Sequence, residues 1–321
     1  MDGLEKLRHA YQEINESFSK TIVFHCGASA GIFSEINCMI GFMAYCLKHE
    51  IRFTLYSDDA NFSQNGWQAF FQPFCQECHE TFHHHYNHRL PYLSEKNELL
   101  KLLQFLPKQY LKRKYHFDYL TYELWDKVIT RNQSDDPLQI PELGMNGTIR
   151  DAVPILLRII WNFNEQTRSE IDQLMKPVLP ETNFAGIQLR FGDKKTEAEI
   201  FEASRYLDLL NQHSDLRKAF IMTDDYETGF RQLKANYPSW EFSTLTPESD
   251  HGYSQAVRDR QSETEKRSRF IMLFATVEIL IRSKIFCGML SSNPSRFVWM
   301  AKNYRDCLFV DESHTCKETI Q

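Results

Sequence analysis

Short apolar segments alternate with amphipathic ones from residue 184 to residue 310, and this alternation limits the fold more than any other feature of the sequence. The short segments, at 184–189, 218–222, 240–242, 285–287 and 307–310, have the length and composition of buried strands. The longer segments, at 199–210, 227–236, 267–282 and 294–302, have the periodicity of helices. Strands that alternate with helices in this way predict a doubly wound parallel sheet.

The amino-terminal half begins with units of the same kind. A helical pattern over residues 4–20 precedes a strand at 21–25, a turn of small residues, a long apolar helix at 32–49 and a strand at 51–56. Pro177 and Pro180 interrupt the chain shortly before the strand at 184. We therefore expect an α/β protein of two domains, residues 1–180 and 181–321.

Composition argues against several functions. The 321 residues carry a formal net charge of −6, which argues against general binding of nucleic acid. The two longest apolar runs, at 32–47 and 270–281, are interrupted by Glu35 and Asn37 and by Glu278, respectively. Neither run therefore has the character of a membrane-spanning helix. The amino terminus lacks the basic and apolar regions of a signal peptide. The sequence therefore predicts a cytoplasmic protein without stable membrane insertion.

Polar side chains follow three of the predicted strands. Arg190, Gly192, Asp193, Lys194 and Glu197 follow the first strand, Asp224 and Asp225 the second, and Ser291, Ser292, Asn293 and Arg296 the fourth. The carboxyl ends of parallel strands meet at one edge of a sheet, where open α/β sheets bind ligands. Each segment alone also fits an ordinary role, as a solvated loop, an Asx turn or a helix N-cap. Together, with hydroxyl groups, backbone N–H groups and a guanidinium at a helix start, they predict a nucleotide ligand.

Two further motifs leave alternatives open. Gly27 and Gly31 precede the long apolar helix, where they suit either an anion at the helix N-terminus or close packing of strand and helix. The second motif combines thiols and imidazoles of the kind that bind zinc: Cys75, Cys78, His79, His83, His84, His85 and His88. Because these histidines are crowded rather than spaced as a second ligand pair, we expect a surface turn and no metal.

Several segments together resemble the α-1,6-fucosyltransferase family, which includes the core N-glycan and nodulation enzymes. Residues 186–194, Gly-Ile-Gln-Leu-Arg-Phe-Gly-Asp-Lys, are similar to the family's segment of a histidine and arginines followed by Asp-Lys and Glu. Thr223-Asp-Asp corresponds to its Thr-Asp-Asp, and residues 291–296 resemble its Ser-Ser-Gln-x-x-Arg. In the amino-terminal half, Gly27, Gly31 and residues 65–74 resemble its Gly-rich turn and its Gly-Trp-Glu-x-x-Phe-x-Pro element. The resemblance runs from about residue 21 to residue 300 in the family's order.

The resemblance implies a GT-B fold, with two Rossmann-like domains that face a cleft and the donor site in the carboxyl-terminal sheet. It also implies an inverting transfer of fucose from GDP-fucose to a hydroxyl of a GlcNAc-type glycan, without a metal or other cofactor. The implied partners are a nucleotide-sugar donor and a glycan acceptor.

By position, the resemblance places Arg190 on the donor diphosphate and Glu197 as the general base, with Lys194 and Asp193 ordering the loop and Glu199 as the alternative base. The remaining residues that it places around the donor are Gln188, Gly27, Gly31, Asp224, Asp225, Glu278, Ser291, Ser292, Asn293 and Arg296.

Three departures from the family pattern keep other hypotheses open. Gln188 replaces the histidine of the family, and Phe191 replaces its second arginine. Its guanine-reading carboxylate falls at Phe274 or Ala275, so that Glu278, one helical turn away, is the possible substitute. One alternative is therefore a glycosyltransferase that uses another nucleotide sugar on the same fold. The other is a non-catalytic relative that binds a sugar or a nucleotide.

Overall fold

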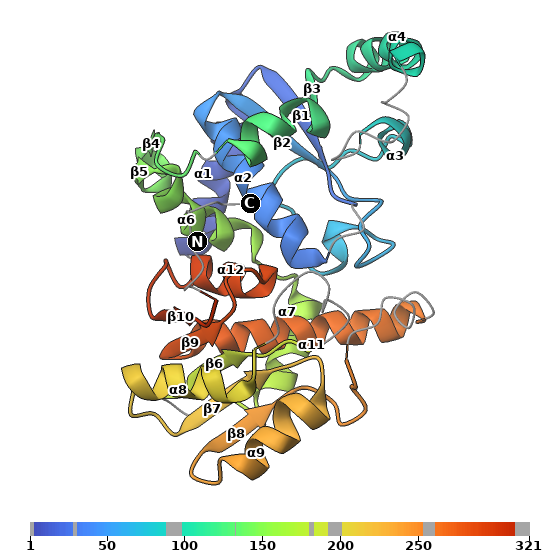
Figure 1. Ribbon diagram of the computed structural model, residues 1–321. Helices are drawn as coiled ribbons and strands as arrows, with labels where there is room; N and C mark the ends of the chain where they lie inside the picture. The colour runs from blue at the N-terminus through green and yellow to red at the C-terminus, as the bar shows by residue number, and fades with distance from the viewer. Residues whose placement is uncertain are drawn as a thin grey trace. The chain divides into compact units, whose positions relative to one another are not determined.

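The computed structural model describes residues 3–27, 31–87, 98–131, 133–179, 183–191, 201–252 and 261–311, and the side chains of helix α4 from residue 105. The chain forms two compact units, Met1–Asn164 and Glu165–Lys317 (Figure 1). Each unit contains a parallel sheet with helices, so the predicted α/β class is confirmed. None of the helices in the described ranges combines the length and the apolar character that crossing a bilayer requires.

The second unit begins with helix α7 (Glu165–Met175), whereas the sequence analysis places the domain boundary after residue 180. Two ion pairs join α7 to helix α11 (Glu263–Arg282). Arg267 Nη2 lies 3.1 Å from Glu170 Oε1, and Arg168 Nη1 lies 3.2 Å from Glu278 Oε2. The helix before the prolines therefore packs with the unit that follows them.

A five-stranded parallel sheet forms the centre of the second unit. Its strands are β6 (Ala185–Gln188), β7 (Lys218–Met222), β8 (Glu241–Thr244), β9 (Ile285–Gly288) and β10 (Cys307–Phe309). The order across the sheet is β10-β9-β6-β7-β8. The chain thus moves outward from β6 to β8 and then returns to the other side of β6 with β9. This is the Rossmann order, and its switch point lies between β6 and β9.

Helices cover both faces of this sheet. Besides α7 and α11 they are α8 (Ala203–His213), the π-turn η6 (Glu227–Arg231), α9 (Gln232–Asn236) and α12 (Asn293–Ala301). Because side chains alternate along a strand, Ile187 of β6 packs in one buried cluster with Leu207 of α8. Gly186 faces the other way, where a Cβ atom would lie 2.9 Å from Leu280 of α11. The doubly wound arrangement expected from the sequence is therefore present.

Three of the helices predicted in this unit differ in detail. Helix α8 begins at Ala203 and ends at His213, whereas the predicted helix spans 199–210. Helix α11 begins at Glu263, four residues before the predicted start. Ser262 Oγ accepts a hydrogen bond from Glu265 N at 3.3 Å, and Glu265 Oε2 accepts one from Ser262 N at 2.8 Å. This capping box satisfies N–H groups of the first turn and extends the helix backwards. The helix predicted at 227–236 is a π-turn followed by a short α-helix.

The first unit has a smaller parallel sheet, of order β2-β1-β3. Its strands are β1 (Lys20–His25), β2 (Ile51–Tyr56) and β3 (Tyr119–Leu120). Its helices are α1 (Gly3–Ser17), α2 (Ile32–Lys48), η1 (Trp67–Ala69), α3 (Phe82–Tyr86), α4 (Glu98–Tyr115), α5 (Thr121–Trp125), η3 (Asp126–Thr130), η4 (Pro141–Leu143) and α6 (Ile149–Ile160). An antiparallel hairpin of β4 (Pro137–Ile140) and β5 (Met145–Thr148), which the sequence analysis did not predict, precedes α6.

The two faces of strand β1 differ in chemistry. Phe24 packs on the face of α2, with its ring centroid 5.0 Å from that of Phe42. Val23 lies in the buried cluster on the opposite face. His25 shares that face, because side chains two residues apart point the same way, and its ring stacks on Tyr56 at 5.5 Å. The apolar face builds the core, and the other face leads to a polar cluster at the carboxyl end of the sheet.

Candidate functional site

The switch point of the second unit brings the end of β6 next to the start of α12. Gln188 Oε1 accepts a hydrogen bond from Ser295 Oγ at 2.5 Å, and the same hydroxyl oxygen accepts one from Met289 N at 3.2 Å. Gln188 is 3% exposed and Ser295 is fully buried. The amide oxygen of Gln188, which the resemblance assigns to the donor, is thus bonded inside the protein.

Two polar atoms at the same edge of the sheet are buried without a hydrogen-bond partner among the described residues. They are Arg190 Nε, two residues after β6, and Ser292 Oγ, at the N-cap of α12. Ser292 is 6% exposed, and leaving such a hydroxyl unsatisfied costs about 1–3 kcal/mol. A guanidinium, a hydroxyl and a helix N-terminus together suit an anion. We call residues 188–191 and 289–292 the switch-point edge.

A carboxylate of the protein shapes the loop that precedes α12. Asp311, which follows β10, accepts hydrogen bonds from Leu290 N at 2.8 Å and from Ser291 N at 2.9 Å. Arg296 Nε donates to Leu290 O at 2.7 Å. The N–H of Ser291 and the Nε of Arg296 are therefore used within the protein. Asn293 is the first residue of α12.

Asp224 and Asp225 hold the chain at the end of β7. Asp224 Oδ1 accepts from Phe191 N at 2.8 Å, which ties the segment after β6 to the next strand. Asp225 accepts from Thr228 N at 3.0 Å and from Thr228 Oγ1 at 3.1 Å. Asp225 thus caps the following turn, as in the Asx alternative of the sequence analysis, while Asp224 positions the segment that carries Arg190.

The resemblance places recognition of the guanine base on α11. The side chains there are apolar, except for a carboxylate that already forms ion pairs. Phe274 and Ala275 are fully buried. Glu278 Oε2 lies 3.2 Å from Arg168 Nη1 and 3.5 Å from Arg282 Nη2. The carboxylate of Glu278 therefore forms ion pairs with α7 and with its own helix.

Several predicted site residues lie outside the described residues. They are Gly192, Asp193, Lys194, Glu197 and Glu199. The general base assigned by resemblance stays a prediction.

The two glycines of the first unit have different surroundings. A Cβ atom at Gly27 would lie 2.5 Å from Asp59 Cβ and 2.9 Å from Asp59 O. Gly31 is the N-cap of α2, its carbonyl accepts from Ser34 N at 2.9 Å, and a Cβ atom there would meet nothing within 4 Å. Gly27 thus permits the close approach of two loops, which is the packing alternative of the sequence analysis.

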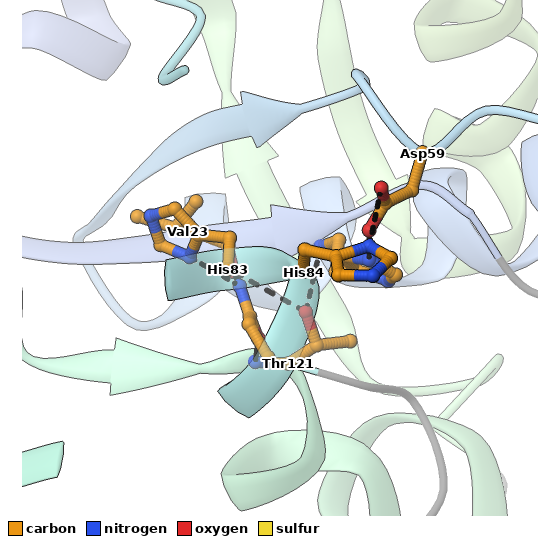
Figure 2. Close-up of polar contacts among 7 residues, drawn as sticks. Val23, Asp59, His83, His84 and Thr121 are labelled. Carbon is orange, nitrogen blue, oxygen red and sulfur yellow. Dashed lines mark hydrogen bonds and ion pairs between the residues drawn. The ribbon is translucent and has the colours of Figure 1, made fainter. Parts of the chain in front are cut away.

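Asp59 joins two histidines at the carboxyl end of this smaller sheet (Figure 2). Its Oδ2 lies 2.7 Å from His25 Nε2 and its Oδ1 lies 2.8 Å from His84 Nδ1. Burial opposes ionisation of Asp59, but the hydrogen bonds from His25 and His84 outweigh it, so the pKa of this carboxyl lies below its ordinary value. The side chains of His25 and Asp59 are 2% and 19% exposed, and that of His84 is 60% exposed. We call these three residues the imidazole edge.

Hydrogen bonds from neighbouring elements fix this edge. Thr121, the residue after β3, bonds to the end of β1 through its side chain. Its Oγ1 accepts a hydrogen bond from His25 N at 2.7 Å and donates one to Val23 O at 3.2 Å. Asn87 Nδ2 donates to Val23 O at 2.8 Å and lies 3.1 Å from His83 Nδ1. Burial, and then the neighbouring His25, lower the pKa of His83 to about 3, so His83 is neutral at physiological pH.

Part of the histidine-rich segment contributes to this edge, through His83 and His84. Its described residues form no group of three or more metal-binding side chains, and His79 pairs with Asp58 at 2.9 Å. His88 lies outside the described residues. The imidazole edge was not predicted from the sequence, although a usable signal was present. His25 ends β1 and Asp59 follows the neighbouring parallel strand β2, so the carboxyl ends of these strands bring the two residues to one edge of the sheet.

The chain matches no protein-family model and no curated protein. Among solved structures, NodZ α-1,6-fucosyltransferase soaked with GDP-fucose aligns with a TM-score of 0.50 and 12% sequence identity, over 88% of this chain and 92% of that chain. The two proteins share a fold. Fucosyltransferase NodZ from Bradyrhizobium aligns with a TM-score of 0.49 and 10% identity, over 88% and 93% of the two chains. POFUT1 in complex with GDP-fucose aligns with a TM-score of 0.48 and 10% identity, over 91% and 98%. The predicted GT-B-like fold class is thus confirmed at the level of the fold.

Proposed function

We propose that this protein is an inverting glycosyltransferase that transfers fucose from GDP-fucose to a hydroxyl group of a GlcNAc-type glycan. The observation that carries the proposal is the pair of buried polar atoms at the switch-point edge, Arg190 Nε and Ser292 Oγ. A diphosphate offers acceptor oxygens to both. The fold shared with NodZ, a fucosyltransferase whose structure was determined after soaking with GDP-fucose, supports the same reaction. The cytoplasmic location stays a prediction.

In the proposed reaction, Arg190 binds the diphosphate and stabilises the charge that develops on the departing GDP. Ser292 and the N-terminus of α12 bind a phosphate oxygen. Glu197 takes the proton of the acceptor hydroxyl, with Lys194 and Asp193 ordering its loop and Glu199 as the alternative. The reaction in this form uses no metal ion, because the guanidinium and the helix N-terminus supply the positive charge.

A second candidate keeps the fold and the chemistry but uses another nucleotide sugar. The observation that favours it is in α11, where Phe274 and Ala275 are buried and Glu278 is paired with two arginines. A guanine base would have to recruit Glu278 from those ion pairs, whereas a different base could bind without that carboxylate.

Calorimetric titration with GDP, UDP, CDP and ADP tests both candidates. For fucosyl transfer we expect GDP to bind most tightly and Arg190→Ala to weaken its binding by at least tenfold, because charge-assisted hydrogen bonds contribute about 1.5–3 kcal/mol each. Arg217→Ala is the matched control, since Arg217 is exposed and immediately precedes β7, at the amino-terminal edge of the sheet.

Three other results would change the assignment. Tighter binding of another nucleotide would favour the second candidate. If none of the four bound to the wild-type protein, both candidates would be wrong. If GDP-fucose bound but was never consumed with an acceptor present, the protein would be a non-catalytic relative.

A further inference from the structure

The imidazole edge has the geometry of an oriented proton acceptor (Figure 2). His84 Nδ1 lies 2.8 Å from Asp59 Oδ1. An ionised carboxylate only accepts hydrogen bonds, so the proton of a neutral His84 ring is on Nδ1 and its lone pair is on Nε2. His84 is 60% exposed. The ring is therefore held at one nitrogen and open to a ligand at the other.

The second oxygen of Asp59 fixes the direction of the pair. His25 Nε2 holds Oδ2 at 2.7 Å, and the ring of His25 is 2% exposed and stacked on Tyr56. Gly27 lets the backbone of Asp59 approach the end of β1. His25 is thus a positioning residue for Asp59, and Asp59 is one for His84. A histidine ring whose first nitrogen is held by such a group presents its second nitrogen in one fixed direction.

The charges around His84 favour a neutral ligand over an anion. A second exposed pair, His79 Nδ1 and Asp58 Oδ1 at 2.9 Å, lies in the segment between β2 and α3, which also carries Asp59. Glu80 Oε2 lies 3.8 Å from His83 Nε2. Among the described residues, the ion pairs of this edge join carboxylates to imidazoles and include no lysine or arginine. Carboxylates would repel a phosphate, whereas imidazoles and carboxylates both form hydrogen bonds with the hydroxyl groups of a sugar.

We propose that the imidazole edge binds a carbohydrate acceptor through a hydrogen bond from one of its hydroxyl groups to His84 Nε2, an inference that rests on the proposed glycosyl transfer. Asp59 keeps the proton of the ring on Nδ1 and leaves the lone pair of Nε2 for that hydroxyl group. His84 is thus a ligand-binding residue of the first unit, and the general base of the transfer stays as proposed above.

His84→Asn is the sharpest test, because the asparagine amide can still donate to Asp59 while the second ring nitrogen is lost. His85→Asn is the matched control: His85 is the next residue of α3, it is exposed, and its ring centroid lies 4.9 Å from that of His84. For both variants we would measure binding of chitotriose by calorimetry, GDP binding in the same way, and kcat and KM for transfer from GDP-fucose to chitotriose.

We expect His84→Asn to weaken chitotriose binding and to raise KM for chitotriose, each by about fivefold, as loss of one hydrogen bond does, and to leave GDP binding unchanged. His85→Asn should leave all three values within about twofold of wild type. In wild-type protein, nitrogen-15 spectra should show the His84 proton on Nδ1, and Asp59→Asn should redistribute it between the two nitrogens.

Three outcomes separate this inference from the proposed function. A His84→Asn variant that retains chitotriose binding would overturn the inference and leave fucosyl transfer intact. Failure of chitotriose to bind to the wild-type protein would also overturn it. Chitotriose binding that depends on His84, in a protein that does not bind GDP, would support the acceptor site and refute the proposed donor.

Discussion

The two parallel sheets of this protein end in polar clusters that differ in one respect. At the imidazole edge the protein itself supplies the partners, so that both oxygens of Asp59 are bonded to histidines. At the switch-point edge, Arg190 Nε and Ser292 Oγ are buried without a partner in the described part of the chain. Buried polar groups are normally hydrogen-bonded, and an exception calls for an explanation. The carboxylate of Asp59 is thus satisfied within the protein, whereas Arg190 Nε and Ser292 Oγ are left for a ligand to satisfy.

Gly27→Ala should disrupt the imidazole edge and have the largest effect on stability. The new Cβ atom would lie 2.5 Å from Asp59 Cβ, so the two loops must separate. We expect a loss of about 3 kcal/mol in the free energy of unfolding of the first unit and a weaker contact between Asp59 and His84. Calorimetric melting measures the loss. Gly31→Ala, where the added atom meets nothing within 4 Å, should change stability by less than about 0.5 kcal/mol, and equal effects of the two substitutions would contradict the packing argument.

Acid should weaken the same edge through His83. Its pKa of about 3 in the folded protein lies below the value of 6.5 for an ordinary histidine, so the unfolded chain binds a proton first as the pH falls. The contribution of neutral His83 is complete above about pH 6.5 and is lost progressively between there and pH 3. At 1.36 kcal/mol per pH unit, the loss is about 2 kcal/mol by pH 5. Urea titrations of wild type and His83→Gln at pH 7 and 5 should show a smaller pH dependence in the variant, and parallel curves would argue against a neutral buried His83.

Much of the second unit follows from sequence pattern alone. The strands at 218–222 and 285–287 were predicted to within a residue, because a short apolar run between turn formers has few alternatives. The capping box at Ser262 was not used, although its residues are visible in the sequence, and the start of α11 was therefore placed too late. Adjacency to the switch point also followed from strand order for Arg190 and Ser292.

Which polar atoms are already bonded did not follow from the sequence. The bond from Ser295 to Gln188 joins residues 107 positions apart, and those from Leu290 and Ser291 to Asp311 span helix α12 and strand β10. Such pairs depend on the register of strands and helices, and a local motif carries no information about that register. The same limit explains why His25, Asp59 and His84, from three separate segments, were not recognised as one cluster.

Ser295→Ala tests the part of the switch-point edge that the protein completes. The substitution removes the hydroxyl that bonds Gln188 Oε1 and Met289 N. Two buried polar groups then lose a partner, and we expect a loss of about 1–2 kcal/mol in the free energy of unfolding of the second unit. A denaturant titration followed by the fluorescence of the tryptophans measures it. An unchanged midpoint would mean that water replaces the hydroxyl.

Ser292→Ala should have the smallest effect on stability and the more informative effect on binding. Ser292 lies three residues before Ser295 and is also buried, but its Oγ has no partner among the described residues. Removing an unsatisfied hydroxyl loses no hydrogen bond of the protein, so the free energy of unfolding should stay the same or rise slightly. If the hydroxyl binds a phosphate, the affinity for GDP should fall about fivefold, which corresponds to about 1 kcal/mol. The two substitutions, three residues apart at the start of one helix, are thus expected to have different effects. Ser295→Ala lowers the free energy of unfolding, whereas Ser292→Ala lowers only the affinity for GDP. If Ser292→Ala destabilised the protein as much as Ser295→Ala and left GDP binding unchanged, Ser292 Oγ would be satisfied within the protein as the oxygens of Asp59 are, and the case for a diphosphate there would be lost.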